Sequence, residues 1–212
     1  MLTGPRGYRS EEIMIDVYRE SLSKLVTPVG RVLAAAHVSP HLVSMSGIVL
    51  GCISAYFFVS HQWILAIVFF ALSGLSDTVD GMVARARGLQ SSFGSFFDNF
   101  CSAYTDSAVF AGLIGARLCD PWWGVAALAG TLTRLLSFRL DGLVSKGEAQ
   151  ALRSRFPSAL FGKGDRIVLV AIGAAFGRID VAIVAIAIGT NLIAAHRCYH
   201  LYAWERAGKS RV

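Results

Sequence analysis

The sequence has few charged residues and no paired cysteines. Only 16% of its 212 residues are charged, whereas a soluble domain carries about 25%, and this shortage argues against a soluble protein. Its four cysteines are scattered without a C-x-x-C pair, so we expect neither a disulfide nor a thiolate metal site. The polar start, charged through Glu20, lacks the order of a signal peptide. No linker or repeat divides the chain, which favours a single domain.

Long apolar segments dominate what is present, since 54% of the residues are hydrophobic. A helix needs about 20 mostly apolar residues to cross a bilayer. Short connections between the segments predict antiparallel helical hairpins. The fold class we expect is all-α, a polytopic membrane protein with six transmembrane helices. The six segments lie near 40–60, 62–86, 92–118, 121–141, 165–177 and 179–203.

The basic residues orient this expected bundle. Among the 20 Lys and Arg residues, all but Arg117 and Arg178 fall on one side if both termini share that side. Cytoplasmic loops carry such an excess, so we expect an integral cell-membrane protein whose termini and functional site are cytoplasmic. Topology and anionic lipid headgroups then explain the net charge of +6, and we expect no nucleic-acid partner.

Residues 10–37 alternate charged and aliphatic side chains before the first apolar segment. This pattern predicts an amphipathic helix that lies along the cytoplasmic interface. A solvated helix that docks another chain is the alternative. The expected organisation is therefore a cytoplasmic segment over 1–38 with this helix, a six-helix membrane domain over 39–204 and a cytoplasmic tail over 205–212.

Acidic residues lie inside two consecutive apolar segments, where carboxylates by default mark function. Asp77 and Asp80 are three residues apart, and Asp98 and Asp106 are eight apart, so each pair shares one face of a helix. Facing carboxylates offer the oxygen ligands that Mg²⁺ or Mn²⁺ prefers. A proton relay or an ion-transport path is the alternative, although the clustering of the acids at the cytoplasmic end disfavours transport.

Glycine and arginine accompany these acids. Gly81 follows Asp80, and Gly94 precedes Asp98 by four residues, so another group can approach the helix backbone at both places. Arg85 adds a guanidinium one turn beyond Gly81. Metal ions, an open backbone and a guanidinium together suit a diphosphate.

These residues resemble the motif of the CDP-alcohol phosphotransferases, D-x-x-D-G-x-x-A-R, eight residues, then G-x-x-x-D-x-x-x-D. The stretch Ser39–Ser44 also looks like the family's T-P-N-x-V-T before the first span, and the resemblance covers most of the chain from Thr27 onward. The motif positions that match are Asp77, Asp80, Gly81, Ala84, Arg85, Gly94 and Asp98.

The resemblance implies metal-dependent transfer of a phosphatidyl-type group from a CDP-linked lipid to an alcohol, with release of CMP. It implies that Asp77, Asp80 and Asp98 hold Mg²⁺ or Mn²⁺, and that the nucleotide diphosphate lies against Gly81, Ala84, Arg85 and Gly94. It also implies a homodimer in the membrane. The expected partners are therefore the CDP-linked lipid, a polar alcohol, membrane lipid and a second copy.

The last aspartate of the motif is replaced by Ser102. In the family that carboxylate is a metal ligand and the favoured general base, and a serine hydroxyl cannot take up a proton at neutral pH. Asp106 lies one turn further and is a candidate displaced base, so Asp98, Ser102 and Asp106 are the candidate catalytic residues. Three readings stay open: an active enzyme with a shifted base, a slow enzyme, or a silent paralogue that binds CDP-lipid or partners an active relative.

Basic residues between the fourth and fifth segments favour a phosphorylated acceptor. Relatives that make phosphatidylinositol phosphate carry basic stretches in the fourth and fifth helices, and Arg139, Lys163 and Arg166 fall in the corresponding places here. These three are the candidate acceptor-binding residues, and inositol phosphate is the expected acceptor. Ordinary loop charge from the membrane topology is the alternative.

Overall fold

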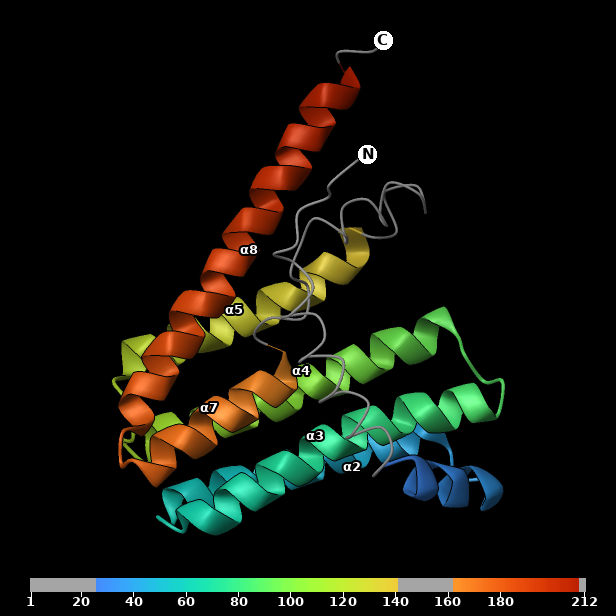
Figure 1. The fold of residues 1–212 in the computed structure, drawn as a ribbon, viewed down its shortest axis with the longest axis horizontal. Helices are drawn as coiled ribbons and strands as arrows, with labels where there is room; N and C mark the ends of the chain where they lie inside the picture. Colours follow the sequence, from blue (N-terminus) through green and yellow to red (C-terminus); the bar gives the residue numbers. More distant parts are fainter. Residues whose placement is uncertain (1–25, 141–161, 210–212) are drawn as a thin grey trace, which may run out of the picture.

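The structure is a computed structural model that describes residues 26–140 and 162–209, and the described residues are helical apart from short turns (Figure 1). This confirms the all-α prediction. A short helix, Val26–Ala35, precedes the long ones. The long helices are α2 (Pro40–Val59), α3 (Trp63–Ala86), α4 (Ser92–Gly115), α5 (Pro121–Leu140), α7 (Lys163–Ala175) and α8 (Ile179–Lys209).

Local chemistry sets where these helices begin and end. Pro40 stands in the first turn of α2, where a missing N–H costs least. The Ser91 hydroxyl accepts the backbone N–H of Gly94 at 2.9 Å and caps α4. The backbone N–H of Gly162 donates to the Asp165 carboxylate at 2.9 Å and fixes the start of α7.

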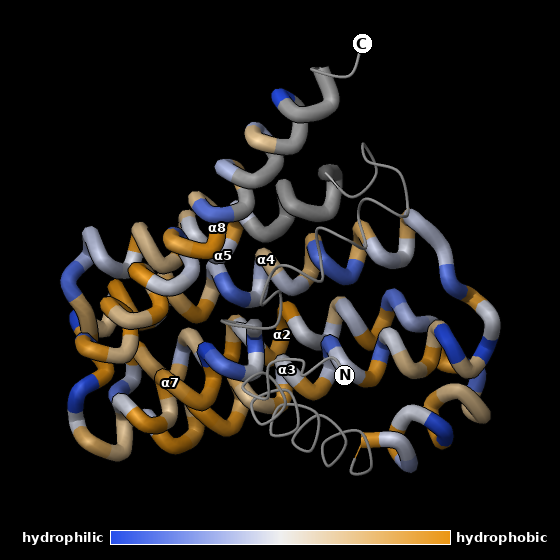
Figure 2. Tube along the Cα trace, turned by 45° about the horizontal axis from the view of Figure 1, so that its top comes forward, coloured by the Kyte–Doolittle hydropathy of each residue, from blue (hydrophilic) through white to orange (hydrophobic). Residues whose placement is uncertain are grey.

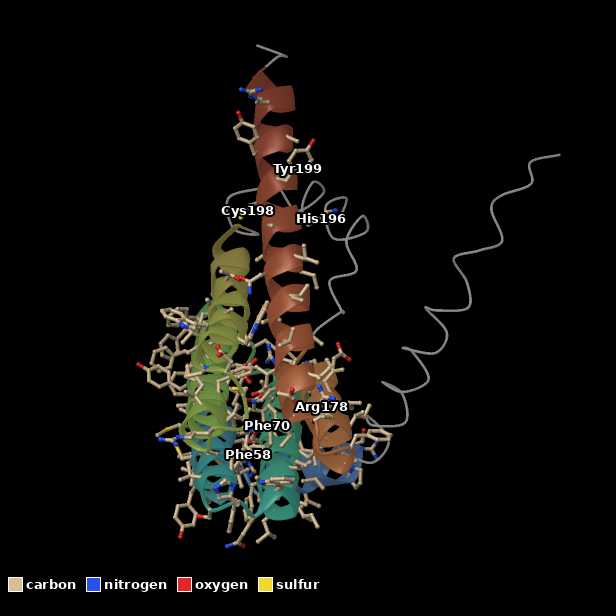
Figure 3. The ribbon with its side chains drawn as sticks, turned by 90° about the vertical axis from the view of Figure 1, so that its left-hand side faces the viewer. Phe58, Phe70, Arg178, His196, Cys198 and Tyr199 are labelled. Carbon is tan, nitrogen blue, oxygen red and sulfur yellow. The ribbon has the colours of Figure 1, made fainter. Side chains whose placement is uncertain are left out.

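The helices pack as neighbouring antiparallel pairs. Helix α2 lies against α3 and α4, α5 lies against α4 and α8, and α7 lies between α3 and α8. Figure 1 shows α8 running beyond the end of the others. The core is a set of fully buried apolar side chains, among which Phe58 and Phe70 are visible in Figure 3.

Three helices are long and apolar enough to cross a membrane within the described residues: Pro40–Val59, Trp63–Ala86 and Ile179–His196. Large apolar side chains also face outward, with Ile64 80% and Trp122 82% exposed. Figure 2 shows hydrophobic positions running along α7 and its neighbours. Such a surface suits lipid rather than water. A membrane protein is therefore supported, while the six-span count stays a prediction.

The expected interfacial helix over 10–37 lies partly outside the described residues. Only its last part, the helix Val26–Ala35, is described. Val26 is buried in a small cluster with Val43, Val79 and Val83 from α2 and α3. This part of the chain therefore packs on the bundle at the end where α2 begins and α3 ends.

Helices α2 and α4 approach closely through glycine. A Cβ added at Gly112 would lie 2.7 Å from the Cα and 2.8 Å from the carbonyl oxygen of Ala55, which are backbone atoms that cannot turn away. Gly51 has a similar place opposite Thr105, where a Cβ would lie 2.6 Å from the side chain. Small residues of this kind let membrane helices pack backbone to backbone.

We expect Gly112→Ala to destabilise the protein by about 1–3 kcal/mol, because the new methyl group forces α2 and α4 apart. Thermal unfolding in detergent measures the change. Gly115→Ala is the matched control, since its Cβ would lie 3.7 Å from Val59 in ordinary contact and alanine favours a helix. Equal unfolding temperatures for the two variants would contradict this packing.

Candidate functional site

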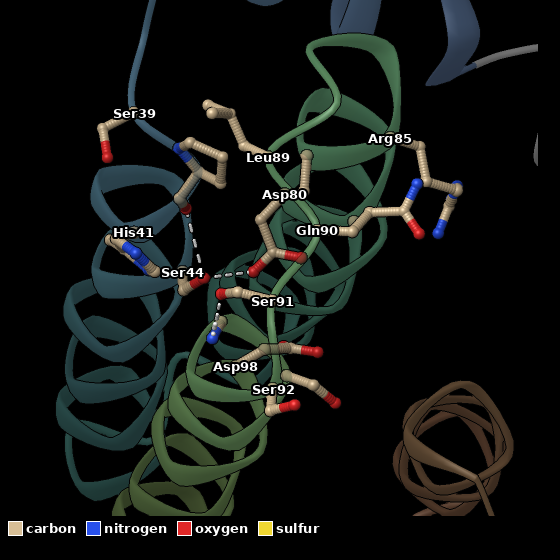
Figure 4. Close-up of a pocket in the computed structure, with 15 residues that line it drawn as sticks. Ser39, His41, Ser44, Asp80, Arg85, Leu89, Gln90, Ser91, Ser92 and Asp98 are labelled. Carbon is tan, nitrogen blue, oxygen red and sulfur yellow. Dashed lines mark hydrogen bonds between the residues drawn. The ribbon is translucent and has the colours of Figure 1, made fainter.

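A pocket of about 980 Å³ lies where α2 begins, α3 ends and α4 begins (Figure 4). The motif residues of two helices meet at its wall, although they are separated by a turn in the sequence. The predicted site residues that line it are Asp80, Gly81, Ala84, Arg85, Gly94 and Asp98.

Contacts between the ends of the helices hold this pocket in shape. Arg87 follows α3 and donates from Nη1 to the carbonyl oxygens of His37 and Val38, at 3.2 and 3.0 Å. These carbonyls belong to the segment just before α2. The α3–α4 turn is therefore tied to the start of α2, and the three walls of the pocket are joined.

Asp80 is the buried acid of the pocket, with 3% of its surface exposed. Its Oδ2 accepts a hydrogen bond from the Ser44 hydroxyl on α2 (Figure 4). Its Oδ1 is buried and has no hydrogen-bond partner among the described residues. A buried carboxylate oxygen without a partner is costly, and a cation is the group that would compensate it.

Asp98 lines the same pocket from α4. It makes no salt bridge with any residue in the described part of the chain. Two carboxylates and the Ser44 hydroxyl thus offer oxygen atoms of the type that Mg²⁺ and Mn²⁺ prefer. Within residues 26–140 and 162–209, no three His, Cys, Asp or Glu side chains are grouped to hold a metal. Asp80 and Asp98 are the carboxylates of this pocket that would hold a cation.

Asp77 has other partners. Its Oδ1 lies 3.0 Å from the ammonium Nζ of Lys163, and its Oδ2 accepts from the Ser102 hydroxyl at 2.6 Å. Lys163 also lies 3.4 Å from Ser102 Oγ and 3.4 Å from the carbonyl oxygen of Ser73. The structure therefore brings three predicted site residues, Asp77, Ser102 and Lys163, into one hydrogen-bonded cluster beside the pocket.

Asp106 and Arg166 form a buried ion pair between α4 and α7. Arg166 Nη2 lies 2.7 Å from Asp106 Oδ2, and their side chains are 2% and 3% exposed. Arg166 Nη1 also approaches the Thr131 hydroxyl of α5 at 3.5 Å. The pair therefore joins three helices away from the pocket lining, and the predicted roles of Asp106 as base and Arg166 as acceptor ligand stay predictions.

Arg139 lies in α5, but its side chain is outside the described residues. Two contacts were missed by sequence reasoning, the Lys163–Asp77 pair and the Arg166–Asp106 pair. Each joins residues on different helices, so no spacing rule along the chain could have found it. The only signal was the presence of basic residues at the start of a segment that faces acidic helices.

Residues 37–204 match the family model described as CDP-alcohol phosphatidyltransferase. The chain belongs to this family. The predicted resemblance is confirmed over the six long helices, and the enzyme class that follows from it is a transferase of substituted phosphate groups.

Among curated family members, the chain is 31% identical over 174 residues to phosphatidylinositol phosphate synthase of Mycolicibacterium smegmatis, covering 76% of this chain and 73% of that one. It is 30% identical over 162 residues to the same enzyme of Mycobacteroides abscessus, covering 74% and 71%. Archaetidylinositol phosphate synthase of Pyrococcus horikoshii is 24% identical over 187 residues, covering 88% and 95%.

The fold also matches a solved family member. The crystal structure of Mycobacterium tuberculosis phosphatidylinositol phosphate synthase (PgsA1) with CDP-DAG bound has a TM-score of 0.55 and 20% identity, covering 83% of this chain and 92% of that one. The apo form of the same enzyme gives the same TM-score. At this level of identity the comparison supports the fold alone.

We expect Arg166→Met to destabilise the protein by about 3–5 kcal/mol, because the buried Asp106 carboxylate would lose the Arg166 guanidinium. Adding Asp106→Leu should restore much of that loss, since both charges are then gone. Thermal unfolding measures both variants. Arg178→Met is the control, since that arginine pairs with Asp180 at an exposed site and should change little. No recovery in the double variant would contradict the ion-pair assignment.

Proposed function

We propose that the protein transfers a phosphatidyl-type group from a CDP-linked lipid to an alcohol, in a metal-dependent reaction that releases CMP during phospholipid synthesis. The observation that carries the proposal is the pocket, in which the unpartnered buried oxygen of Asp80 lies with Asp98, Arg85 and two motif glycines. This combination suits a diphosphate that arrives with a divalent cation.

Each residue around the pocket has a proposed task. Asp80 and Asp98 would hold Mg²⁺ or Mn²⁺, which when bound neutralises charge on the diphosphate and on the departing CMP. Arg85, exposed and without an ion pair in the described residues, binds diphosphate oxygens. Gly81 and Gly94 leave space for the nucleotide at the helix surfaces.

The acceptor that we propose is inositol phosphate. The relatives named above are phosphatidylinositol phosphate synthases and an archaetidylinositol phosphate synthase. Of the three candidate acceptor residues, Lys163 lies in the first turn of α7, where its ammonium pairs with Asp77. Arg166 fixes α7 through Asp106, and Arg139 stays a candidate contact.

The proposed setting is a six-span membrane protein with both termini and the pocket on the cytoplasmic side, acting as a homodimer. The basic residues of the sequence favour this orientation. The pocket is lined by the end of α3, where Arg85 lies, and by the α3–α4 turn, which begins at Arg87. A cytoplasmic pocket gives a water-soluble inositol phosphate direct access to the site.

A second candidate function is binding of CDP-lipid without turnover. Ser102 supports it, because its hydroxyl donates to Asp77 and lies beside the Lys163 ammonium. In this arrangement it cannot remove a proton from an acceptor. The protein would then sense CDP-lipid or pair with an active relative.

We expect CMP release from CDP-diacylglycerol and inositol phosphate in nanodiscs, dependent on Mg²⁺ or Mn²⁺. Asp80→Asn should lower the rate by about 100-fold, because the cation loses a charged ligand. CMP is measured by chromatography across a panel of alcohols. Asp120→Asn, at an exposed site at the start of α5, is the control and should leave the rate unchanged. No CMP with any acceptor would count against the enzyme.

The variant Ser102→Asp distinguishes the active transferase from the protein that binds CDP-lipid without turnover. If the missing carboxylate limits proton removal, this variant should turn over at least about tenfold faster than the parent, because a general base contributes 10²–10⁴-fold. Single-turnover CMP formation measures the step. Tight Mn²⁺-dependent CDP binding with no CMP from either form would favour the binding protein instead.

A further inference from the structure

We propose that Lys163 is a resident cation on Asp77, so that the site takes a single divalent cation, held by Asp80 and Asp98. This inference rests on the proposed function, because it concerns the metal stoichiometry of the same site. In this arrangement the Lys163 ammonium takes the place of a second metal ion, and the Ser102 hydroxyl takes the place of a carboxylate ligand of that ion.

The contacts of Lys163 are those of a built cation site. An ammonium has three N–H donors, and three acceptors surround this one: Asp77 Oδ1 at 3.0 Å, and Ser73 O and Ser102 Oγ, each at 3.4 Å. The lysine side chain is only 9% exposed. It therefore reaches from the first turn of α7 into a sheltered position between α3 and α4.

Both oxygens of Asp77 already have a partner, although its side chain is 25% exposed. Lys163 takes Oδ1, and the Ser102 hydroxyl donates to Oδ2 at 2.6 Å. Asp80 differs, because its buried Oδ1 has no partner in the described residues. The two carboxylates share one face of α3, yet only Asp80 is arranged to receive a further cation.

The balance of charges in the site also favours a single divalent cation. Asp77, Asp80 and Asp98 carry three negative charges, and Lys163 neutralises the one on Asp77. Two negative charges remain, on Asp80 and Asp98, which one divalent cation balances, and the Arg85 guanidinium on the same wall is left for diphosphate oxygens. Packed carboxylates stay ionised only where such positive charge is close.

Ser102 completes this balance. A carboxylate at this position would lie against Oδ2 of Asp77, where like charges repel, and it would call for one more positive charge than Lys163 supplies. A neutral hydroxyl instead donates to Asp77 and accepts from Lys163, so the cluster is satisfied without a second metal ion. The serine and the lysine therefore belong to one arrangement.

The test is a count of Mn²⁺ bound per chain in nanodiscs, with CDP present, from the loss of the free-Mn²⁺ electron paramagnetic resonance signal. We expect one Mn²⁺ in the parent and two in the double variant Ser102→Asp/Lys163→Met. Asp77→Asn should still bind one, whereas Asp80→Asn should bind none. Arg178→Met is the control. It removes an exposed cation from the turn between α7 and α8, and this variant should bind one Mn²⁺.

Two Mn²⁺ per parent chain would overturn the inference and leave the proposed function standing, because Lys163 would then only hold the place of a metal. One Mn²⁺ in the double variant would overturn the role of Lys163. Loss of Mn²⁺ in Asp77→Asn would do the same, and this single isosteric change avoids the refolding risk of the double variant. No Mn²⁺ in the parent would overturn the inference together with the metal dependence on which it rests.

Discussion

A carboxylate buried among apolar helices needs a positive charge close to it, and the contacts between α3, α4 and α7 follow from this requirement. Asp106 meets Arg166 in a buried ion pair, and Asp77 meets Lys163. Asp80 accepts the Ser44 hydroxyl on one oxygen, and its other oxygen has no hydrogen-bond partner in the part of the chain that the structure describes. Lys163 and Arg166 both lie at the start of α7, so this short helix supplies the positive charge that pairs with acids of α3 and α4. The carboxylates left without a cation, Asp80 and Asp98, are those for which we propose a metal ion and a nucleotide diphosphate.

The bounds of the long helices were predictable from the sequence to within three residues, because apolar runs set their length. The exception is the end of α8, which reaches Lys209, six residues past the predicted end at 203, because its last turns are polar and carry no apolar signal. The seven matching motif positions likewise predicted which residues would meet, and six of those residues line one pocket or its wall. Asp77 is the exception. Its side chain turns to α7, and the spacing of Asp77 from Asp80 along one helix says nothing about a third helix that begins 86 residues later.

The partners of the acids could not be predicted for the same reason. Lys163 and Arg166 were candidate ligands of a phosphorylated acceptor, because basic residues between the fourth and fifth segments favour an anion and relatives carry basic residues in the corresponding place. The fold uses both to neutralise carboxylates. In the sequence alone, Ser102 is interpreted as the loss of a general base. In the structure its hydroxyl lies between Lys163 and Asp77 and forms hydrogen bonds with both.

Helix α8 is longer than a bilayer requires. At 1.5 Å per residue, its 31 residues extend about 46 Å, against a hydrocarbon layer of about 30 Å. The apolar stretch ends at His196, and Figures 1 and 3 show the rest of the helix, with Cys198 and Tyr199, continuing past the bundle. With Ile179–His196 across the hydrocarbon layer, the last turns of α8 would extend beyond it. A spin label or fluorophore on these last turns would report the sidedness and tilt of α8 without touching the pocket.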